Sequence, residues 1–325
     1  MGQSVDIAGV PWSVPWNAMR SYGYHRDVNA PSADPSPRLP RRLGVVGLGL
    51  LGGSVALAAR RFAIENGNDL EIIGFARRAE TRRWAMDNGM VDVVTDQVAT
   101  VAACDLVVIA TPVDGIAHWV IQVVESNPAA SVTDVGSTKA AIVDQVSDDA
   151  QARRRFLAAH PIAGGENSGA PNAVAELFDG KPVVITRSGF EDGIFVDPIC
   201  EFWVALGGRL VELSPAQHDR QLAVTSHLPH LMAALTARGV DQHASAIVGA
   251  GWLDTTRVAA GDPELWTAIV RQNRAAILDS LSNVRQDMDC LIDAIHSGDD
   301  AAVTRWLASA QAIRHSVVPS ASRVG

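Results

Sequence analysis

A glycine-rich loop between an apolar run and a helical stretch restricts the fold of this chain more than any other feature of its sequence. The apolar run Leu43–Val46 has the character of a buried strand, and the stretch that continues through Arg60 has that of a helix. The loop begins with Gly47, Leu48, Gly49, Leu50, Leu51 and Gly52. Its glycines allow a tight turn and the close approach of a pyrophosphate, and the N-terminus of the following helix offers N–H groups to the phosphates. This position between strand and helix favours a dinucleotide-binding loop over a merely tight turn.

Strand-length apolar runs alternate with helix-length segments as far as Leu213. The candidate strands are Leu43–Leu48, Glu71–Ala76, Asp105–Thr111, Ser131–Val135, Phe156–His160, Pro182–Thr186 and Arg209–Leu213. Strands with apolar residues on both faces fit a parallel sheet covered by helices. We therefore predict a doubly wound, Rossmann-type α/β domain over residues 41–213. Because strand patterns stop there, we predict an all-helical domain over residues 214–318, and the prolines among residues 1–40 predict a flexible Pro-rich tail.

Charge and cysteine content narrow the partners and the compartment. The chain has 27 Lys and Arg against 36 Asp and Glu, a formal net charge of −9, and no dense basic run. This balance argues against nucleic acid or an anionic membrane as the main partner. No stretch of about 18 uncharged apolar residues occurs, and the cysteines are few and far apart, which is typical of a reducing compartment. We expect a cytoplasmic protein whose partner is a small molecule or a second copy.

The end of the second candidate strand bears on the choice of cofactor. A ribose with free hydroxyls requires Asp or Glu there, whereas this chain has Ala76 followed by Arg77 and Arg78. Guanidinium groups without a neighbouring carboxylate suit a 2′-phosphate, so the pattern favours NADP over NAD. The same arginines are compatible with a solvated helix start in an enzyme that takes NAD or both cofactors. Thr111 and Pro112 end another strand, where they either line the nicotinamide side of the crevice or form an ordinary loop.

Two polar residues at strand ends are candidates for chemistry. Ser137 follows a strand and begins a helix, where it either caps the helix or faces the crevice. His160 ends the next candidate strand. An imidazole in that place can act as general base for a hydroxyl whose carbon gives up hydride, while the alternative is a loop histidine that caps a turn.

The helical part of the chain adds further polar residues in apolar surroundings. Ser226 and His230 are four residues apart and so share one helix face. His227 and His230 have the spacing of a metal pair, but no Cys or carboxylate nearby completes a ligand set, so we expect no metal. Arg257, three residues after Asp254, is either a clamp for a substrate carboxylate or part of an exposed ion pair.

Taken together, these segments resemble the prephenate/arogenate dehydrogenase family of tyrosine biosynthesis, over roughly residues 41 to 315. Besides the glycine loop, the motifs that carry the resemblance are Asp134–Lys139, His160–Gly164, His218-Asp219, Ser226–His230 and Arg257–Ala259, which leads to Trp266. Several motifs in this order are more specific than any one of them. The resemblance implies a nicotinamide-dependent dehydrogenase that forms homodimers through its helical domain.

The resemblance also implies roles for particular residues. His160 would be the catalytic histidine that accepts the proton of a ring hydroxyl, and Ser137 would orient it. The implied substrate-binding residues are Arg257, His230, Ser226, Glu166, Asp254 and Trp266. A histidine that accepts a proton implies activity that rises with pH near neutrality. The chain departs from the usual family pattern at Gly261, where Ser is usual, and at Ala268, where Asp is usual, so these positions bear on substrate preference.

The implied reaction is the oxidative decarboxylation of prephenate to 4-hydroxyphenylpyruvate, with hydride transfer to NAD or NADP. Arogenate dehydrogenase is the nearest alternative, because arogenate carries an ammonium group in place of a keto group, and Glu166 or Asp254 is available to pair with it. A β-hydroxyacid dehydrogenase typically relies on a lysine base in its helical domain, and residues 215–315 contain no lysine. A catalytically inactive NADP-binding sensor has no need of His160, Ser137 and Arg257 together.

Overall fold

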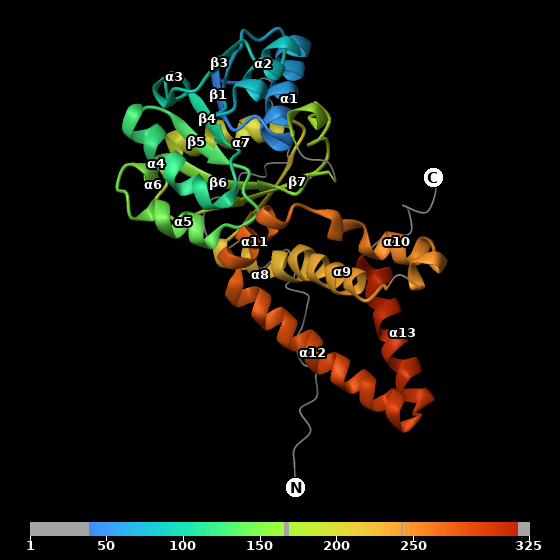
Figure 1. Ribbon diagram of the computed structural model, residues 1–325. Helices are drawn as coiled ribbons and strands as arrows, with labels where there is room; N and C mark the ends of the chain where they lie inside the picture. Colours follow the sequence, from blue (N-terminus) through green and yellow to red (C-terminus); the bar gives the residue numbers. More distant parts are fainter. Residues whose placement is uncertain (1–38, 166–168, 242, 318–325) are drawn as a thin grey trace. The chain divides into compact units, whose positions relative to one another are not determined.

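Eight strands form one sheet in the part of the chain that the structure describes. The computed structural model describes residues 39–165, 169–241 and 243–317 (Figure 1); most of the expected tail and Glu166 lie outside these ranges. The strands are β1 (Arg42–Val46), β2 (Glu71–Phe75), β3 (Val93–Thr95), β4 (Leu106–Ile109), β5 (Ser131–Asp134), β6 (Phe156–Pro161), β7 (Pro182–Thr186) and β8 (Arg209–Leu213). Their spatial order is β3-β2-β1-β4-β5-β6-β7-β8. The sequence did not predict β3, which has only three residues and pairs with β2 at the sheet edge.

The sheet is parallel apart from one pair of strands. β6 and β7 run antiparallel, with His160 opposite Val184, whereas the other neighbouring strands of this sheet run parallel to each other. The described residues between β6 and β7 form the short turn η4 (Ala170–Asn172) and no crossover helix, so the chain returns beside β6 in the opposite direction. The doubly wound sheet is confirmed, and the expectation that it is parallel throughout is wrong at this pair.

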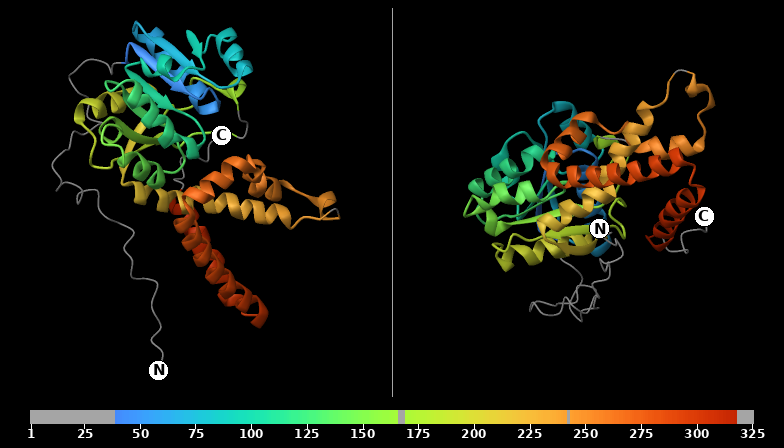
Figure 2. Two further views of the ribbon diagram at one scale, coloured as in Figure 1. Left: turned by 60° about the vertical axis from the view of Figure 1, so that its left-hand side comes forward. Right: turned by 90° about the horizontal axis from the view of Figure 1, so that it is seen from below.

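Helices cover both faces of the sheet, so the strands are buried on both sides (Figure 2). Leu106 and Val108 of β4 belong to one hydrophobic core, and Val107 and Ile109 belong to the other. Helices α1 (Leu50–Asn66), α2 (Ala79–Asp87) and α7 (Gly193–Ala205) contribute to the first core. Helices α3 (Val98–Ala102), α4 (Ile116–Ser126), α5 (Ala140–Ser147) and α6 (Ala152–Arg155) contribute to the second. This double burial explains the uninterrupted apolar character of the strands.

After β8, every described element is helical. These elements, which we call the helical segment, are α8 (Pro215–Leu222), η5 (Ala223–His227), α9 (Leu228–Arg238), η6 (Ala244–Ile247), α10 (Ala250–Thr256), η7 (Arg257–Ala260), α11 (Pro263–Gln272), α12 (Arg274–Ser297) and α13 (Asp300–Val317). The turn η5 is π-helical and joins α8 to α9 without a break. No helix within the described ranges combines the length and the apolarity that crossing a membrane requires.

Candidate active site

The glycine loop lies where the strand order reverses, between β1 and its neighbour β4. Gly47 has a φ of +101°, and a Cβ there would lie 2.6 Å from the carbonyl oxygen of Ala110. A Cβ on Gly52 would lie 1.9 Å from the carbonyl oxygen of Gly47, whereas a Cβ on Gly49 would meet nothing within 4 Å. Turn geometry and packing therefore require Gly47 and Gly52, and Gly49 faces open space. Helix α1 begins here without a side-chain cap or an acidic residue in its first turn, which fits the phosphates of a dinucleotide.

The remaining residues of the loop and of the strand beside it have distinct surroundings. Leu48 is buried in the first core, so it anchors the loop. Leu50 and Leu51 are half-buried in the first turn of α1, where their backbone N–H groups belong to the helix N-terminus. Thr111 is half-buried and Pro112 is exposed at the start of the loop after β4. Because β4 pairs in parallel with β1, this loop lies beside the glycine loop that follows β1. These positions are compatible with the expected cofactor contacts.

Basic residues gather at the end of β2. Ala76 is buried, and Arg77 and Arg78 after it are exposed. Arg82 of α2 donates to the carbonyl oxygens of Ala76, at 2.7 Å, and Arg77, at 2.9 Å, and it pairs with Asp96 at 3.1 Å. Arg82 thus fixes the shape of this corner. Arg77 and Arg78 present two exposed guanidinium groups where the carboxylate that would bind free ribose hydroxyls is missing.

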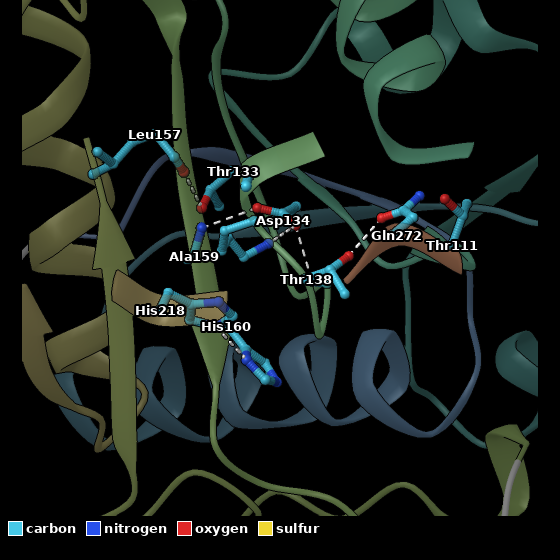
Figure 3. Close-up of polar contacts among 12 residues, drawn as sticks. Thr111, Thr133, Asp134, Thr138, Leu157, Ala159, His160, His218 and Gln272 are labelled. Carbon is cyan, nitrogen blue, oxygen red and sulfur yellow. Dashed lines mark hydrogen bonds and ion pairs between the residues drawn. The ribbon is translucent and has the colours of Figure 1, made fainter. Parts of the chain in front are cut away.

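A hydrogen-bonded series of three titratable side chains ends at His160, near the carboxyl end of strand β6. Nδ1 of His160 lies 2.8 Å from Nε2 of His218 (Figure 3). Nδ1 of His218 lies 2.7 Å from Oδ1 of Asp219. The N–H groups of Lys139 and Ala140, at the start of α5, donate to the two oxygens of Asp219 at 2.8 and 2.9 Å. His218 and Asp219 come from α8, so the helical segment orients a histidine of the sheet.

The protonation states of His160 and His218 follow from that of Asp219. Burial alone raises the pKa of Asp219, but the hydrogen bonds from His218 and from two backbone N–H groups lower it overall, so the group is a carboxylate. A carboxylate only accepts hydrogen bonds, so His218 is protonated on Nδ1 and its Nε2 accepts from Nδ1–H of His160. Burial is the largest cause that holds the pKa of His160 well below 6.5, and the proximity of His218 and of the buried ammonium of Lys139 acts in the same direction. His160 is therefore neutral at neutral pH, with a lone pair on Nε2, which is the form that acts as a base.

A buried ion pair supports the loop between β5 and α5. Nζ of Lys139 lies 2.5 Å from Oδ2 of Asp134, and both side chains are fully buried. Asp134 also accepts from the N–H groups of Gly136 and Ala159, each at 2.9 Å. Burial lowers the pKa of Lys139, and the charge and hydrogen bond of Asp134 oppose that shift. The pair thus ties β5 to β6 and fixes the loop that presents N–H groups to the histidine chain.

Two histidines of the helical segment have buried ring nitrogens without a hydrogen-bond partner among the described residues, namely Nε2 of His227 and Nδ1 of His230. Nδ2 of Asn273 donates to the carbonyl oxygen of Asp219 at 2.7 Å and lies 3.0 Å from Nδ1 of His227. Because an amide nitrogen donates, Nδ1 of His227 accepts and its Nε2 carries the hydrogen. Trp266 stacks on His230, with ring centroids 3.4 Å apart and planes at 14°. These unpaired nitrogens suit a polar ligand.

The structure brings only some of the expected residues together. Asp254 and Arg257 are exposed and line a surface hollow of about 540 Å³ that none of the histidines above lines. Ser226 and Ser137 are half-buried, and among the described residues no hydrogen bond joins Ser137 to His160. The orientation that the resemblance assigned to Ser137 is carried here by His218. No group of three or more His, Cys, Asp or Glu side chains within the described ranges is arranged for a metal ion.

Sequence reasoning missed residues whose partners are distant in the chain. His218 and Asp219 stood out only as a motif, and Asp134 with Lys139 only as part of another. A charged residue at the end of an otherwise apolar strand, as at Asp134, is a usable signal because a buried carboxylate needs partners. Nothing in the sequence around Asn273 indicates its two contacts.

A neutral imidazole at the same sheet edge as a dinucleotide loop defines an NAD(P)-dependent oxidoreductase. Comparison with known proteins gives the family. Residues 56–212 match the model of the prephenate dehydrogenase nucleotide-binding domain, and residues 214–309 match that of the prephenate dehydrogenase dimerization domain. The chain belongs to the prephenate dehydrogenase family, and its cofactor is a nicotinamide dinucleotide.

Individual relatives agree with this assignment. The chain is 30% identical over 271 residues to the cyclohexadienyl dehydrogenase of Zymomonas mobilis subsp. mobilis, covering 80% of this chain and 90% of the relative. It resembles the crystal structure of A. aeolicus prephenate dehydrogenase in complex with hydroxyphenyl propionate and NAD+, with a TM-score of 0.78, 26% identity, and coverage of 88% of this chain and 100% of that one. Synechocystis arogenate dehydrogenase gives a TM-score of 0.71, 30% identity, and coverage of 85% and 100%.

Proposed function

We propose that this chain catalyses the oxidative decarboxylation of prephenate to 4-hydroxyphenylpyruvate and CO2, with hydride transfer to NAD(P). The observation that carries the proposal is His160, whose Nε2 lone pair is fixed by hydrogen bonding through His218 to Asp219. His160 lies near the carboxyl end of β6 and the glycine loop follows β1, and these two strand ends are on the same side of the sheet, so a base and a hydride acceptor there would serve the same carbon.

In this mechanism, Nε2 of His160 accepts the proton of the ring hydroxyl. The bound nicotinamide supplies the acceptor for the hydride that leaves the hydroxyl-bearing carbon. The C–C bond to the ring carboxylate then breaks, its electron pair enters the ring, and CO2 leaves, so that the ring becomes aromatic. Asp219, through His218, stabilises the imidazolium that forms on His160. The proton then returns to the phenolate oxygen, which completes the product.

Substrate binding is assigned to the residues that the resemblance named. Arg257 would hold a substrate carboxylate, and Ser226, His230 and Trp266 would line the ring site, with Glu166 and Asp254 at its entrance. Stacking of Trp266 on buried His230 supports a shaped, apolar wall for a ring. The hydrogen on Nε2 of His227 adds a donor for a substrate oxygen that the resemblance did not name.

Gly261 offers a test of that wall. A Cβ at Gly261 would lie 2.7 Å from Nε1 of Trp266 and 3.0 Å from Cε1 of His230, so the stacked rings would have to move. Because a misplacement of about 1 Å can lower rates by up to ~10²-fold, Gly261→Ala is expected to lower kcat/KM for prephenate by roughly 10-fold. The KM for the dinucleotide should stay within error of wild type. Equal changes in both parameters, measured by steady-state kinetics, would argue against a substrate wall at this position.

The pH dependence follows from the lowered pKa of His160. A base is active when deprotonated, so activity is lost as pH falls through that pKa. Burial and the neighbouring groups hold it well below 6.5, so the rise expected near neutrality moves to more acid pH. Between about pH 5 and pH 9, log kcat/KM for prephenate should be flat at neutral pH and fall only on the acid side. An acid limb centred at or above 6.5 would contradict a desolvated His160 in the free enzyme.

The proposed cofactor preference is NADP over NAD. The support is the corner after β2, where Ala76 replaces a carboxylate and the exposed Arg77 and Arg78 carry positive charge. Arg82 contributes a third guanidinium, although its bonds to backbone carbonyls and to Asp96 already engage it.

We also propose the domain division at residues 213 and 214, and a homodimer formed through the helical segment. α13 has no buried residues, and α12 buries only Ile277 and Ser280. Large apolar side chains are exposed along both helices, namely Leu278, Met288, Ile292, Ile295, Leu307, Ile313 and Val317. An apolar surface of this kind is typical of a protein interface, and it lies largely within the stretch that matches a dimerization domain.

Four assays test the function, pairing prephenate or arogenate with NAD or NADP and following absorbance of the reduced cofactor. A rate with prephenate supports the proposal, and the ratio of rates with NADP and NAD tests the arginine corner. Arogenate dehydrogenase is the second candidate, because Asp254 lies beside Arg257 in one hollow and offers a carboxylate to an ammonium group. A rate with arogenate alone would favour it, and no rate in any assay would favour a non-catalytic NADP-binding protein.

A further inference from the structure

Three consecutive side chains at the junction of α11 and α12 reach three different parts of the candidate site. Arg271 forms an ion pair with Asp114, in the turn η3 (Val113–Gly115) after β4. Gln272 contacts both Asp114 and Thr138. Asn273 donates to the carbonyl oxygen of Asp219 and contacts His227. This junction connects the loop on the nicotinamide side, the loop after β5, and the histidine chain.

Gln272 is the central member, because both ends of its amide are engaged. Oε1 accepts from Oγ1 of Thr138, a fully buried residue, at 2.5 Å, and Nε2 donates to Oδ1 of Asp114 at 3.1 Å. An amide with one acceptor and one donor end matches a hydroxyl on one side and a carboxylate on the other. Figure 3 shows Gln272 between Thr138 and Thr111. The rotamer and the flip state of this side chain are therefore both determined.

Both partners of Gln272 lie next to residues of the proposed chemistry. Thr138 is between Ser137 and Lys139, whose N–H donates to Asp219. Asp114 follows Thr111 and Pro112 within one turn. A shift of either loop would change the distance between the nicotinamide and the base, and hydride transfer is sensitive to such shifts.

We propose that Gln272 is a positioning residue that holds the nicotinamide-side loop and the loop that supports the histidine base at a fixed separation. The inference rests on the proposed dehydrogenase function, since its readout is hydride transfer. Gln272 takes no direct part in proton or hydride transfer and acts through Asp114 and Thr138. The ion pair of Arg271 with Asp114 is exposed, so it adds little by itself and mainly directs the carboxylate.

Gln272→Met tests the proposal, because it keeps the length of the side chain and removes both hydrogen bonds. We expect kcat with prephenate to fall by roughly 10- to 100-fold, while the Kd of the reduced dinucleotide, measured by fluorescence titration, changes by less than about 3-fold. The isotope effect on kcat with substrate deuterated at the hydroxyl-bearing carbon should increase, because hydride transfer then limits the rate. Gln286→Met, at an exposed position of α12, is the matched control and should behave as wild type.

A reciprocal exchange separates positioning from simple loss of packing. Gln272→Glu faces the carboxylate of Asp114 with a second carboxylate and should lower kcat as much as Gln272→Met. Adding Asp114→Asn restores a donor and acceptor pair, so the double variant should recover to within about 5-fold of wild type. No recovery, or a loss of kcat that follows equal losses of dinucleotide affinity and melting temperature, would overturn the proposal. Wild-type protein inactive with both substrates would instead refute the proposed function.

Discussion

Replacing His160 by Asn is expected to lower kcat with prephenate by roughly 10²- to 10⁴-fold, with little change in dinucleotide affinity. Asn retains a side-chain N–H that can donate to Nε2 of His218, so the hydrogen-bonded chain to Asp219 persists. It provides no basic nitrogen at the position of Nε2, so the ring hydroxyl loses its proton acceptor. The loss should appear in kcat and kcat/KM alike, because the base acts in the transition state.

Steady-state kinetics and fluorescence titration of the reduced cofactor check this expectation. His296→Asn, at an exposed position of α12, is the control for a histidine outside the site and should leave both measurements unchanged. A His160→Asn variant with wild-type kcat would remove this residue from the mechanism. A variant that instead lost cofactor binding would show that His160 shapes the crevice and does not take part in proton transfer.

The second large effect is on stability. Asp134→Asn leaves the ammonium of Lys139 fully buried without a charged partner, and breaking a buried ion pair in this way typically costs about 3–5 kcal/mol. The amide keeps the volume of the carboxylate and can still accept from the N–H of Ala159. We therefore expect the free energy of unfolding, measured by urea denaturation at neutral pH, to fall by about that amount.

The pH dependence of this loss has a definite sign. Lys139 already has a lowered pKa in the folded protein because of burial, and removal of Asp134 lowers it further. Between the folded pKa and the unfolded pKa, the unfolded chain binds more protons, so stability rises with pH. The deficit of Asp134→Asn should thus shrink in alkaline buffer. Lys139→Met in the same chain removes the unpaired charge and should recover most of the loss; a deficit that persists in the double variant would mean that the charge is not its cause.

Local patterns predicted much of the fold and of the candidate site. The glycine loop follows β1 as expected, because turn geometry at Gly47 and packing at Gly52 are properties of adjacent residues. The helical segment begins after Leu213 as expected, because periodicity is also local. His160 lies at the end of β6, where its sequence position indicated. The direction of β7 depends on how the chain returns after β6, which no periodic pattern encodes.

The parts that could not be predicted are contacts between residues far apart in the chain. The resemblance suggested Ser137 as the partner of His160, whereas the structure has His218. Asp219 accepts from the N–H groups at the start of α5, and these backbone donors are invisible in a sequence. Such pairings depend on how the helical segment packs on the sheet. The sequence shows which residues have the chemistry, and packing decides which of them meet.

The π-helical turn η5 determines the directions in which His218, before the turn, and His227, at its end, point relative to each other. In an uninterrupted α-helix, a residue nine positions after His218, such as His227, would point about 180° away from it. The wider turn over Ala223–His227 takes fewer degrees per residue and so returns His227 towards Asp219, to which Asn273 links it. The one extra residue of this π-helical turn therefore sets the rotation of α9 relative to α8 about the helix axis. Deleting one residue from η5 would keep the order of the remaining residues. It would rotate His227 away from His218 and Asp219.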